Sequence, residues 1–188
     1  MAEAVLTTER LVLRPPAPDD LPWVLERMNT PAVMRHLGGA VRDAEAVTDS
    51  FHADVAAFAN GGHRRWTVWL RSEDRRIGRC GLFHVRTDAA PVTLRGQNEI
   101  GWTLAEEFWG YGYATEAART VLAFAFEELQ FPHVFSQTSE SNAPSTRMMV
   151  RLGFMPRPDL EYVDPDYPPE DNPTTVWSLA ARDWTRHG

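Results

Sequence analysis

Residues 99–117 read Glu-Ile-Gly-Trp-Thr-Leu-Ala-Glu-Glu-Phe-Trp-Gly-Tyr-Gly-Tyr-Ala-Thr-Glu-Ala, which combines a strand pattern, a turn and the start of a helix. The strand is expected over 98–104, where side chains alternate. In the turn, every second position is small: Gly110, Gly112 and Ala114. A helical pattern follows from Thr115. Small residues let a ligand approach the main chain, and a helix N-terminus offers unpaired N–H groups, so the stretch predicts a seat for a phosphate-bearing cofactor.

A Gly-x-Gly pair before a helix also occurs in other nucleotide-binding loops and in simple tight turns. The dinucleotide-binding (Rossmann) pattern is disfavoured, because its third glycine and later ribose-binding acid are not found in register. The P-loop is excluded, because it requires a lysine and all 19 basic residues of this chain are arginines. The lack of lysine also excludes a Schiff-base mechanism.

Composition bounds the protein class. A chain of 188 residues with 43% hydrophobic residues and seven tryptophans predicts a single packed domain over residues 1–188. The net charge of -7 argues against direct nucleic-acid binding. Cys80 is the only cysteine, which excludes an internal disulfide and fits a reducing, cytoplasmic location.

Metal and membrane association are not expected. The six histidines show no ligand spacing, and there is no second cysteine to complete a metal site. No basic patch followed by an apolar run marks a signal peptide. The longest apolar run, residues 121–126, is far too short to span a bilayer.

The rest of the chain alternates strand and helix patterns. Strands are predicted at 11–13, 66–70, 77–85, 98–104, 133–139 and 175–179. Helices are predicted at 21–28, 44–58, 115–129 and 142–152. The acidic, proline-rich segment 156–173 is expected to be a loop. Hairpin and helix-crossover connections together predict an α/β chain with a mixed sheet.

Residues 108–117, Phe-Trp-Gly-Tyr-Gly-Tyr-Ala-Thr-Glu-Ala, resemble the acetyl-CoA-binding signature of the GNAT acetyltransferases. They are closest to the branch related to the ribosomal-protein N-terminal acetyltransferases RimJ and RimL. Segments 8–14 and 77–82 look like that family's opening and third strands, and 142–145 with 152–154 like its later helix and following strand. The resemblance covers residues 7–184.

The resemblance implies an α/β (α+β) fold with a mixed, mostly antiparallel sheet, splayed central parallel strands at 98–104 and 133–139, and flanking helices. It also implies acetyl-CoA as the acetyl donor, with its pantetheine between those strands and its pyrophosphate on main-chain N–H groups of the turn. A backbone N–H near Thr103 or Leu104 would polarise the thioester. The implied cofactor-binding residues are Trp102, Thr103, Leu104, Trp109, Gly110, Tyr111, Gly112, Tyr113, Ala114, Thr115, Asn142 and Ser145.

Glu99 is the candidate general base, acting directly or through a water. It shares a strand face with Gly101 and Thr103, so it faces a hollow that an amine could enter. The alternative is a structural carboxylate paired with an arginine. Ser145 is the second catalytic candidate, because the resemblance implies that it bonds the CoA thiol or a nearby water.

Asn142 would bond the pantetheine amide, and the alternative for both Asn142 and Ser145 is helix capping. Met149 occupies the place of the general-acid tyrosine that is frequent in the superfamily. A methionine cannot donate a proton, so the thiolate leaves without an acid or takes a proton from another group. A CoA-binding sensor or interaction module without turnover is therefore the alternative function.

The acceptor is expected to be a weakly basic amine. An α-amine is about 10% neutral at pH 7, whereas a lysine amine is below about 0.1% neutral. This favours a peptide or protein N-terminus, or a small-molecule amine. The acidic segment 156–173 would attract a cationic acceptor, or is simply a solvated loop. Exposed strand edges would allow a homodimer.

Overall fold

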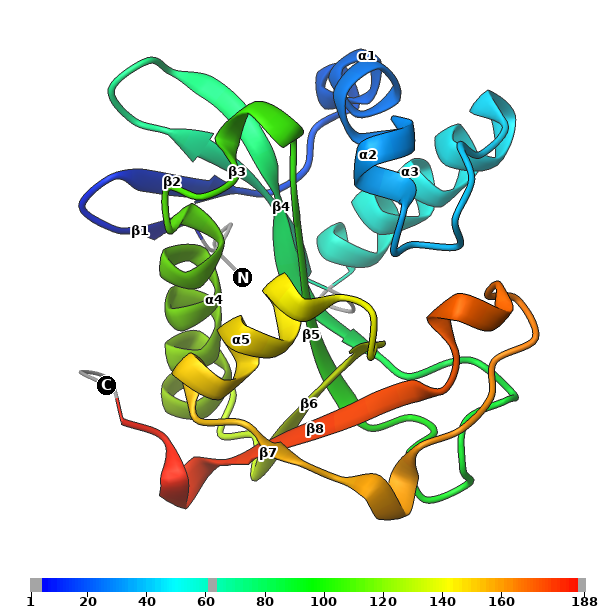
Figure 1. Ribbon diagram of the computed structural model, residues 1–188. Helices are drawn as coiled ribbons and strands as arrows, with labels where there is room; N and C mark the ends of the chain where they lie inside the picture. The colour runs from blue at the N-terminus through cyan, green and yellow to red at the C-terminus, as the bar shows by residue number, and fades with distance from the viewer. Residues whose placement is uncertain (1–4, 61–63, 186–188) are drawn as a thin grey trace.

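The computed structural model describes residues 5–60 and 64–185, and in this part of the chain eight strands form one sheet (Figure 1). The spatial order of the strands is β1-β2-β3-β4-β5-β6-β8-β7. The strands are β1 (Leu6–Thr7), β2 (Leu11–Arg14), β3 (Arg64–Leu70), β4 (Arg75–His84), β5 (Asn98–Leu104), β6 (His133–Ser139), β7 (Met155–Pro156) and β8 (Thr174–Ala180). The helices are α1 (Leu21–Trp23), α2 (Pro31–Met34), α3 (Ala44–Ala59), α4 (Tyr113–Ala123) and α5 (Ala143–Leu152).

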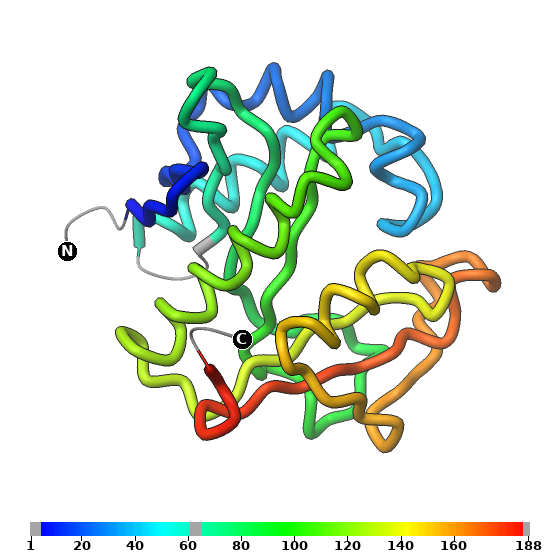
Figure 2. Tube along the Cα trace, turned by 60° about the vertical axis from the view of Figure 1, so that its left-hand side comes forward, coloured from blue at the N-terminus to red at the C-terminus, as the bar shows by residue number. Residues whose placement is uncertain are grey.

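The two central strands diverge. Every neighbouring pair in the sheet is antiparallel except β5 and β6, which run parallel. Although each of these strands has seven residues, the described ladder between them has one paired position, Glu99 opposite Phe135. The C-terminal half of β5 therefore faces β6 without a ladder. In Figure 2 the segments from β6 onward, coloured yellow to red, lie together below the blue and cyan N-terminal segments.

Helices cover both faces of the sheet. One face of β5 carries Ile100, Trp102 and Leu104, and α4 packs against β5, β4 and β2. The buried side of α4 consists of Ala117, Ala118, Val121 and Leu122. Small alanines at two of these positions bring the helix close to the strands. On the opposite side, α3 packs against β3, whereas α5 packs against β6 and contacts α4.

The predicted fold class is confirmed: the sheet is mixed and mostly antiparallel, its central parallel strands are splayed, and helices flank it. The strands predicted at 98–104 and 133–139 have those bounds. The helix predicted at 115–129 begins earlier, at Tyr113, and ends in a π-helical turn over Phe124–Glu128. It begins early because Gly112, in the left-handed conformation, serves as its N-cap.

Two features had no clear signal in the sequence. The first is β1, whose two residues are too few to show alternation. The second is the break in the helix predicted at 21–28, where α1 ends at Trp23 and continues as a π-helical turn over Val24–Met28. Gly61 and Gly62, which follow the predicted helix 44–58 and would end it, lie outside the described residues. Among the described residues, no helix is long and apolar enough to cross a membrane.

Candidate active site

The turn between β5 and α4 is open to solvent. Gly110 and Gly112 have φ values of 83° and 81°, which are strained for any residue with a side chain. Residues 109–112 are exposed, and no side chain caps the N-terminus of α4. The Tyr111 ring stacks on Tyr113 rather than covering the turn, with ring centroids 5.7 Å apart. The main-chain N–H groups of this turn are thus accessible to an anion.

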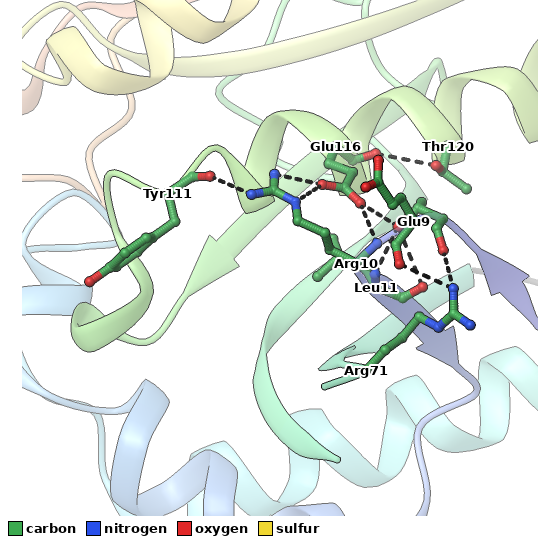
Figure 3. Close-up of polar contacts among 8 residues, drawn as sticks. Glu9, Arg10, Leu11, Arg71, Tyr111, Glu116 and Thr120 are labelled. Atoms are coloured by element: carbon green, nitrogen blue, oxygen red, sulfur yellow. Dashed lines mark hydrogen bonds and ion pairs between the residues drawn. The ribbon is translucent and has the colours of Figure 1, made fainter. Parts of the chain in front are cut away.

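An ion pair between Arg10 and Glu116 stabilises the turn (Figure 3). Glu116, in the first turn of α4, accepts hydrogen bonds from Arg10 Nε at 2.6 Å and from the Arg10 main-chain N–H at 3.1 Å. Arg10 Nη1 donates to the carbonyl of Tyr111 at 3.1 Å. Arg10 therefore ties the β1–β2 turn to the glycine turn, and Glu116 fixes its position. The Thr8 hydroxyl also donates to Glu116, and these bonds hold the Glu116 pKa below its usual value.

Replacing Glu116 with glutamine is expected to lower the free energy of unfolding by about 1–2 kcal/mol at pH 7, through loss of charged hydrogen bonds. The folded-state pKa is depressed, so this stabilisation is present above the unfolded pKa and disappears as pH falls through the folded pKa. Urea unfolding from pH 7 down to about pH 3 measures it, because the loss begins only below the usual glutamate pKa. Glu107→Gln, at an exposed ion pair, is the control, and a difference independent of pH would contradict the assignment.

Beside the turn, β5 ends next to a cavity of about 370 Å³. The Ile100 carbonyl accepts from Ser136 Oγ of β6 at 3.1 Å, and the Leu104 carbonyl accepts from Trp109 Nε1 at 2.8 Å. Main-chain groups of a strand point to alternate sides, so the N–H and C=O of Trp102 face the same gap. The cavity wall includes Trp102, Thr103, Asn142 and Ser145.

The N-terminus of α5 lies at the same cavity. Asn142 is its N-cap, and the side-chain oxygen accepts from the Ser145 N–H at 3.4 Å. The capping alternative is therefore present in the structure, and both side chains also line the cavity. Met149 is fully buried in the core, so it does not reach this space.

Glu99 lies just behind the cavity wall. Its side chain is 9% exposed and accepts from Gln137 Nε2 at 2.8 Å, while Tyr162 donates to Gln137 Oε1 at 2.8 Å. Gln137 and Gly101 line the cavity. Burial raises the Glu99 pKa to about 7, and the bond from Gln137 and the charge of Arg65 moderate that rise. A carboxylate that titrates near neutrality beside a cavity is suited to accept a proton.

Comparison with known proteins shows the family to which the chain belongs. The family described as "Acetyltransferase (GNAT) domain" matches residues 10–155. This chain belongs to the GNAT acetyltransferase family. The N-acetyltransferase p20 of Bacillus licheniformis is 25% identical over 150 residues, which cover 79% of this chain and 81% of p20.

Solved structures agree with this assignment. An acetyltransferase from Agrobacterium tumefaciens str. C58 superposes with a TM-score of 0.77 and 30% identity, covering 95% of each chain. RimL, described as a ribosomal L7/L12 alpha-N-protein acetyltransferase in complex with coenzyme A, superposes with a TM-score of 0.75. At 12% identity, over 94% of this chain and 98% of RimL, that likeness concerns the fold.

As a GNAT acetyltransferase, the protein is an enzyme that uses acetyl-CoA as its acetyl donor. The residues present fit this molecule. The exposed turn with two positive-φ glycines offers main-chain N–H groups for a diphosphate, and the gap beside Trp102 offers unladdered main-chain groups for an amide-bearing chain. Among the described residues, no group of three His, Cys, Asp or Glu side chains could hold a metal ion.

Sequence reasoning about this GNAT site missed several residues. Gln137 is the hydrogen-bond partner of Glu99, and Tyr167 comes to the cavity from the proline-rich segment. Arg65 and Arg79 form another part of the wall. Alternation in 133–139 could have placed Gln137 on one face with Phe135 and Ser139, but the facing register of β5 and β6 was not readable from either strand.

Cys80 plays no part in this chemistry, and its thiol is expected to be unreactive in the folded enzyme. It is 1% exposed within β4, and burial raises its pKa to about 12. Since the thiolate is the nucleophile, an aromatic disulfide reagent should not modify the native protein and should titrate one thiol per chain in denaturant. Rapid stoichiometric reaction of the native enzyme would contradict this burial.

Proposed function

We propose that the enzyme transfers an acetyl group directly from acetyl-CoA to the α-amine of a peptide or protein N-terminus or to a small-molecule amine. Glu99 serves as the general base. The observation that carries this proposal is the buried Glu99 carboxyl, with a pKa near 7, behind a cavity that also reaches the unladdered end of β5. An amine in that cavity would lie between the proton acceptor, Glu99, and the end of β5 that is proposed to bind acetyl-CoA.

The cofactor seat follows from the site geometry. Main-chain N–H groups at Gly110, Tyr111, Gly112, Tyr113, Ala114 and Thr115 hold the diphosphate, and Trp109 keeps the turn against the end of β5 through Leu104. The main chain at Trp102, which faces β6, pairs with the pantetheine, while Thr103, whose main chain is paired with β4, lines the cavity. Asn142 and Ser145 contact it from α5, the Asn142 amide through its remaining donor group.

Acetyl-CoA supplies the acetyl group as a thioester, whose thiolate is the leaving group. The protein's own contribution is to hold the amine, to accept its proton at Glu99 and to keep the thioester carbonyl near main-chain donors. Gln137 separates the Glu99 carboxylate from the cavity, so the proton reaches Glu99 through a water. Deprotonation is easiest for an α-amine, which is neutral about 200-fold more often at pH 7 than a lysine amine, whose pKa is about 2.4 units higher.

The likeness to RimL, which is described as a ribosomal L7/L12 alpha-N-protein acetyltransferase, supports placing the chain in the RimJ/RimL-like branch. The whole chain works as a single N-acetyltransferase domain, because one sheet includes residues from β1 to β8. A cytoplasmic location accords with the reduced, buried Cys80. A homodimer stays a prediction, and sedimentation velocity would measure it.

The alternative is a catalytically silent CoA-binding sensor or interaction module. One observation favours it: the frequent general-acid position is Met149, which lies wholly in the core. Such a module would retain the open glycine turn and the splayed strands, since these bind rather than react. Turnover alone separates the two functions.

The deciding experiment measures thiol release from acetyl-CoA with a panel of α-amino peptides, small amines and lysine-like amines. Calorimetry with acetyl-CoA runs alongside it. We expect saturable binding and release that depends on the acceptor, fastest with α-amines. Binding without any acceptor-dependent release would establish the silent module instead.

A further inference from the structure

One wall of the cavity contains two arginines that share a single carboxylate. Arg79 of β4 donates from Nη2 to Asp54 of α3 at 2.8 Å, and Arg65 of β3 lies 3.6 Å from the same Asp54 oxygen. Both arginines line the cavity, whereas Asp54 does not. The wall therefore presents two cations against one anion that lies behind them.

Arg79 has unused hydrogen-bonding capacity. Its side chain is 10% exposed, and its Nε–H has no hydrogen-bond partner among the described residues. Burial, and after it the charge of Arg65, lowers the Arg79 pKa to about 10. A buried donor without an acceptor is costly, and Arg79 lines the cavity, so its guanidinium has donors to offer an anion bound there.

The strand register places these arginines on the same sheet face as Glu99. Arg65 is opposite Gly81, which is opposite Gly101, and the Phe83 ring lies over Gly101 and under the Arg65 guanidinium. Glu99 lies two residues from Gly101 on the same face of β5. Arg65 is near enough to Glu99 for its charge to lower the Glu99 pKa.

We propose that the cavity selects an acceptor that carries a carboxylate beside its amine, with Arg65 and Arg79 binding the carboxylate while the amine faces Glu99. This inference rests on the acetyl transfer proposed above. Guanidinium groups bind carboxylates through paired N–H donors in a fixed fork, which also orients the ligand. The amine is thereby positioned by a group that does not react.

The acidic proline-rich segment does not oppose this preference. Asp171 is buried and accepts from the Ser141 hydroxyl at 2.6 Å, and Asp164 is buried and accepts from the Asp166 N–H at 3.1 Å. Neither lines the cavity, where this segment contributes Tyr167.

Two sources of carboxylate share this chemistry: the α-carboxylate of an amino-acid-like molecule and an acidic side chain near a peptide N-terminus. Thiol release is measured with two matched pairs. One pair is a free amino acid and its amide, and the other is a tripeptide with Asp or Asn at its second position. We expect kcat/KM to favour the charged member of one pair by about 10- to 100-fold, and that pair identifies the source.

Three variants test the arginines. Arg79→Gln and, in case that variant does not fold, the more exposed Arg65→Gln are each expected to reduce the preference at least about 10-fold. Asp54→Asn removes the carboxylate that competes for the two arginines. This variant is expected to bind the charged acceptor more tightly than the wild-type enzyme does. Arg157→Gln, which breaks an exposed pair with Asp159, is the control and should leave the preference unchanged.

The outcomes separate the two proposals. Equal turnover of charged and neutral members in the wild-type enzyme, or a preference that survives in both arginine variants, overturns the anion site and leaves acetyl transfer intact. No turnover with any amine overturns the proposed function. In that case calorimetry with the N-acetylated amino acid and its amide still decides the anion site, since equal heats from the two would exclude it.

Discussion

Replacing Glu99 with glutamine is expected to lower kcat by about 100-fold or more while leaving acetyl-CoA affinity unchanged. A positioned general base contributes about 10²- to 10⁴-fold, and the amide cannot accept a proton. Glutamine keeps the size of the side chain and an oxygen that can accept from Gln137, so the wall should keep its shape. The loss therefore reports proton transfer rather than packing.

The pH profile makes this result specific. Because burial raises the Glu99 pKa to about 7, wild-type kcat/KM should rise between about pH 6 and 8 as the carboxyl ionises. The Glu99→Gln enzyme should lose that ionisation from its profile. Glu107→Gln, on the exposed turn after β5, is the matched control and should keep both rate and profile. An unaltered rise in the Glu99→Gln enzyme would remove Glu99 as the base.

The same substitution is expected to stabilise the fold. A carboxyl with a raised folded-state pKa binds a proton in the native state that the unfolded state has released, so wild-type stability falls as pH rises from about 4.5 to 7. By that linkage, Glu99→Gln should gain up to about 3 kcal/mol at pH 8 and little below pH 4.5. Denaturant unfolding at the two pH values measures the difference.

Replacing Gly110 with valine is expected to weaken acetyl-CoA binding by about 10-fold or more. The backbone at Gly110 has a φ of 83°, which costs a β-branched residue about 1–3 kcal/mol. Nothing lies within 4 Å of an added Cβ, so no clash opposes the side chain and the strain acts through the backbone. Relief of that strain rotates the N–H groups that would bind the diphosphate.

Gly96 offers a matched control. It has a φ of 75°, also has nothing within 4 Å of an added Cβ, and is in the loop before β5. Gly96→Val should lose similar stability and keep the wild-type dissociation constant for acetyl-CoA. Calorimetry on both variants separates strain from binding. Equal weakening in both, or in neither, would argue against the turn as the diphosphate seat.

Local sequence patterns predicted the secondary structure of the site, because periodicity and glycine placement act over a few residues. β5, its turn and the start of α4 are contiguous, so their arrangement followed from residues 98–117. The partners of Glu99 did not. Gln137 is 38 residues away along the chain, and its bond depends on how β6 lies against β5. Sequence reasoning offered an arginine as partner, whereas the structure gives Glu99 a hydrogen bond from Gln137 and a longer-range effect of the Arg65 charge.

The arginine wall shows the same limit. Arg65, Arg79 and Asp54 come from three elements, and nothing within any one of them reveals the others. Alternation assigns each arginine to a face of its strand, but the strand register decides that both lie beside Gly81 and Gly101. Recognition of an acceptor is thus a property of tertiary structure, whereas the cofactor turn is a property of one segment.

The bond from Ser136 to the Ile100 carbonyl has a thermodynamic consequence. It satisfies a carbonyl that a continued ladder would offer to a main-chain N–H of β6, and the pairing stops there. Beyond this point β5 and β6 are therefore already apart in the free enzyme. A ligand that enters between them need not break a main-chain ladder bond. The free-energy cost of separating the strands is thus met when the protein folds and not when the donor binds. This favours rapid binding of the donor with little change in structure.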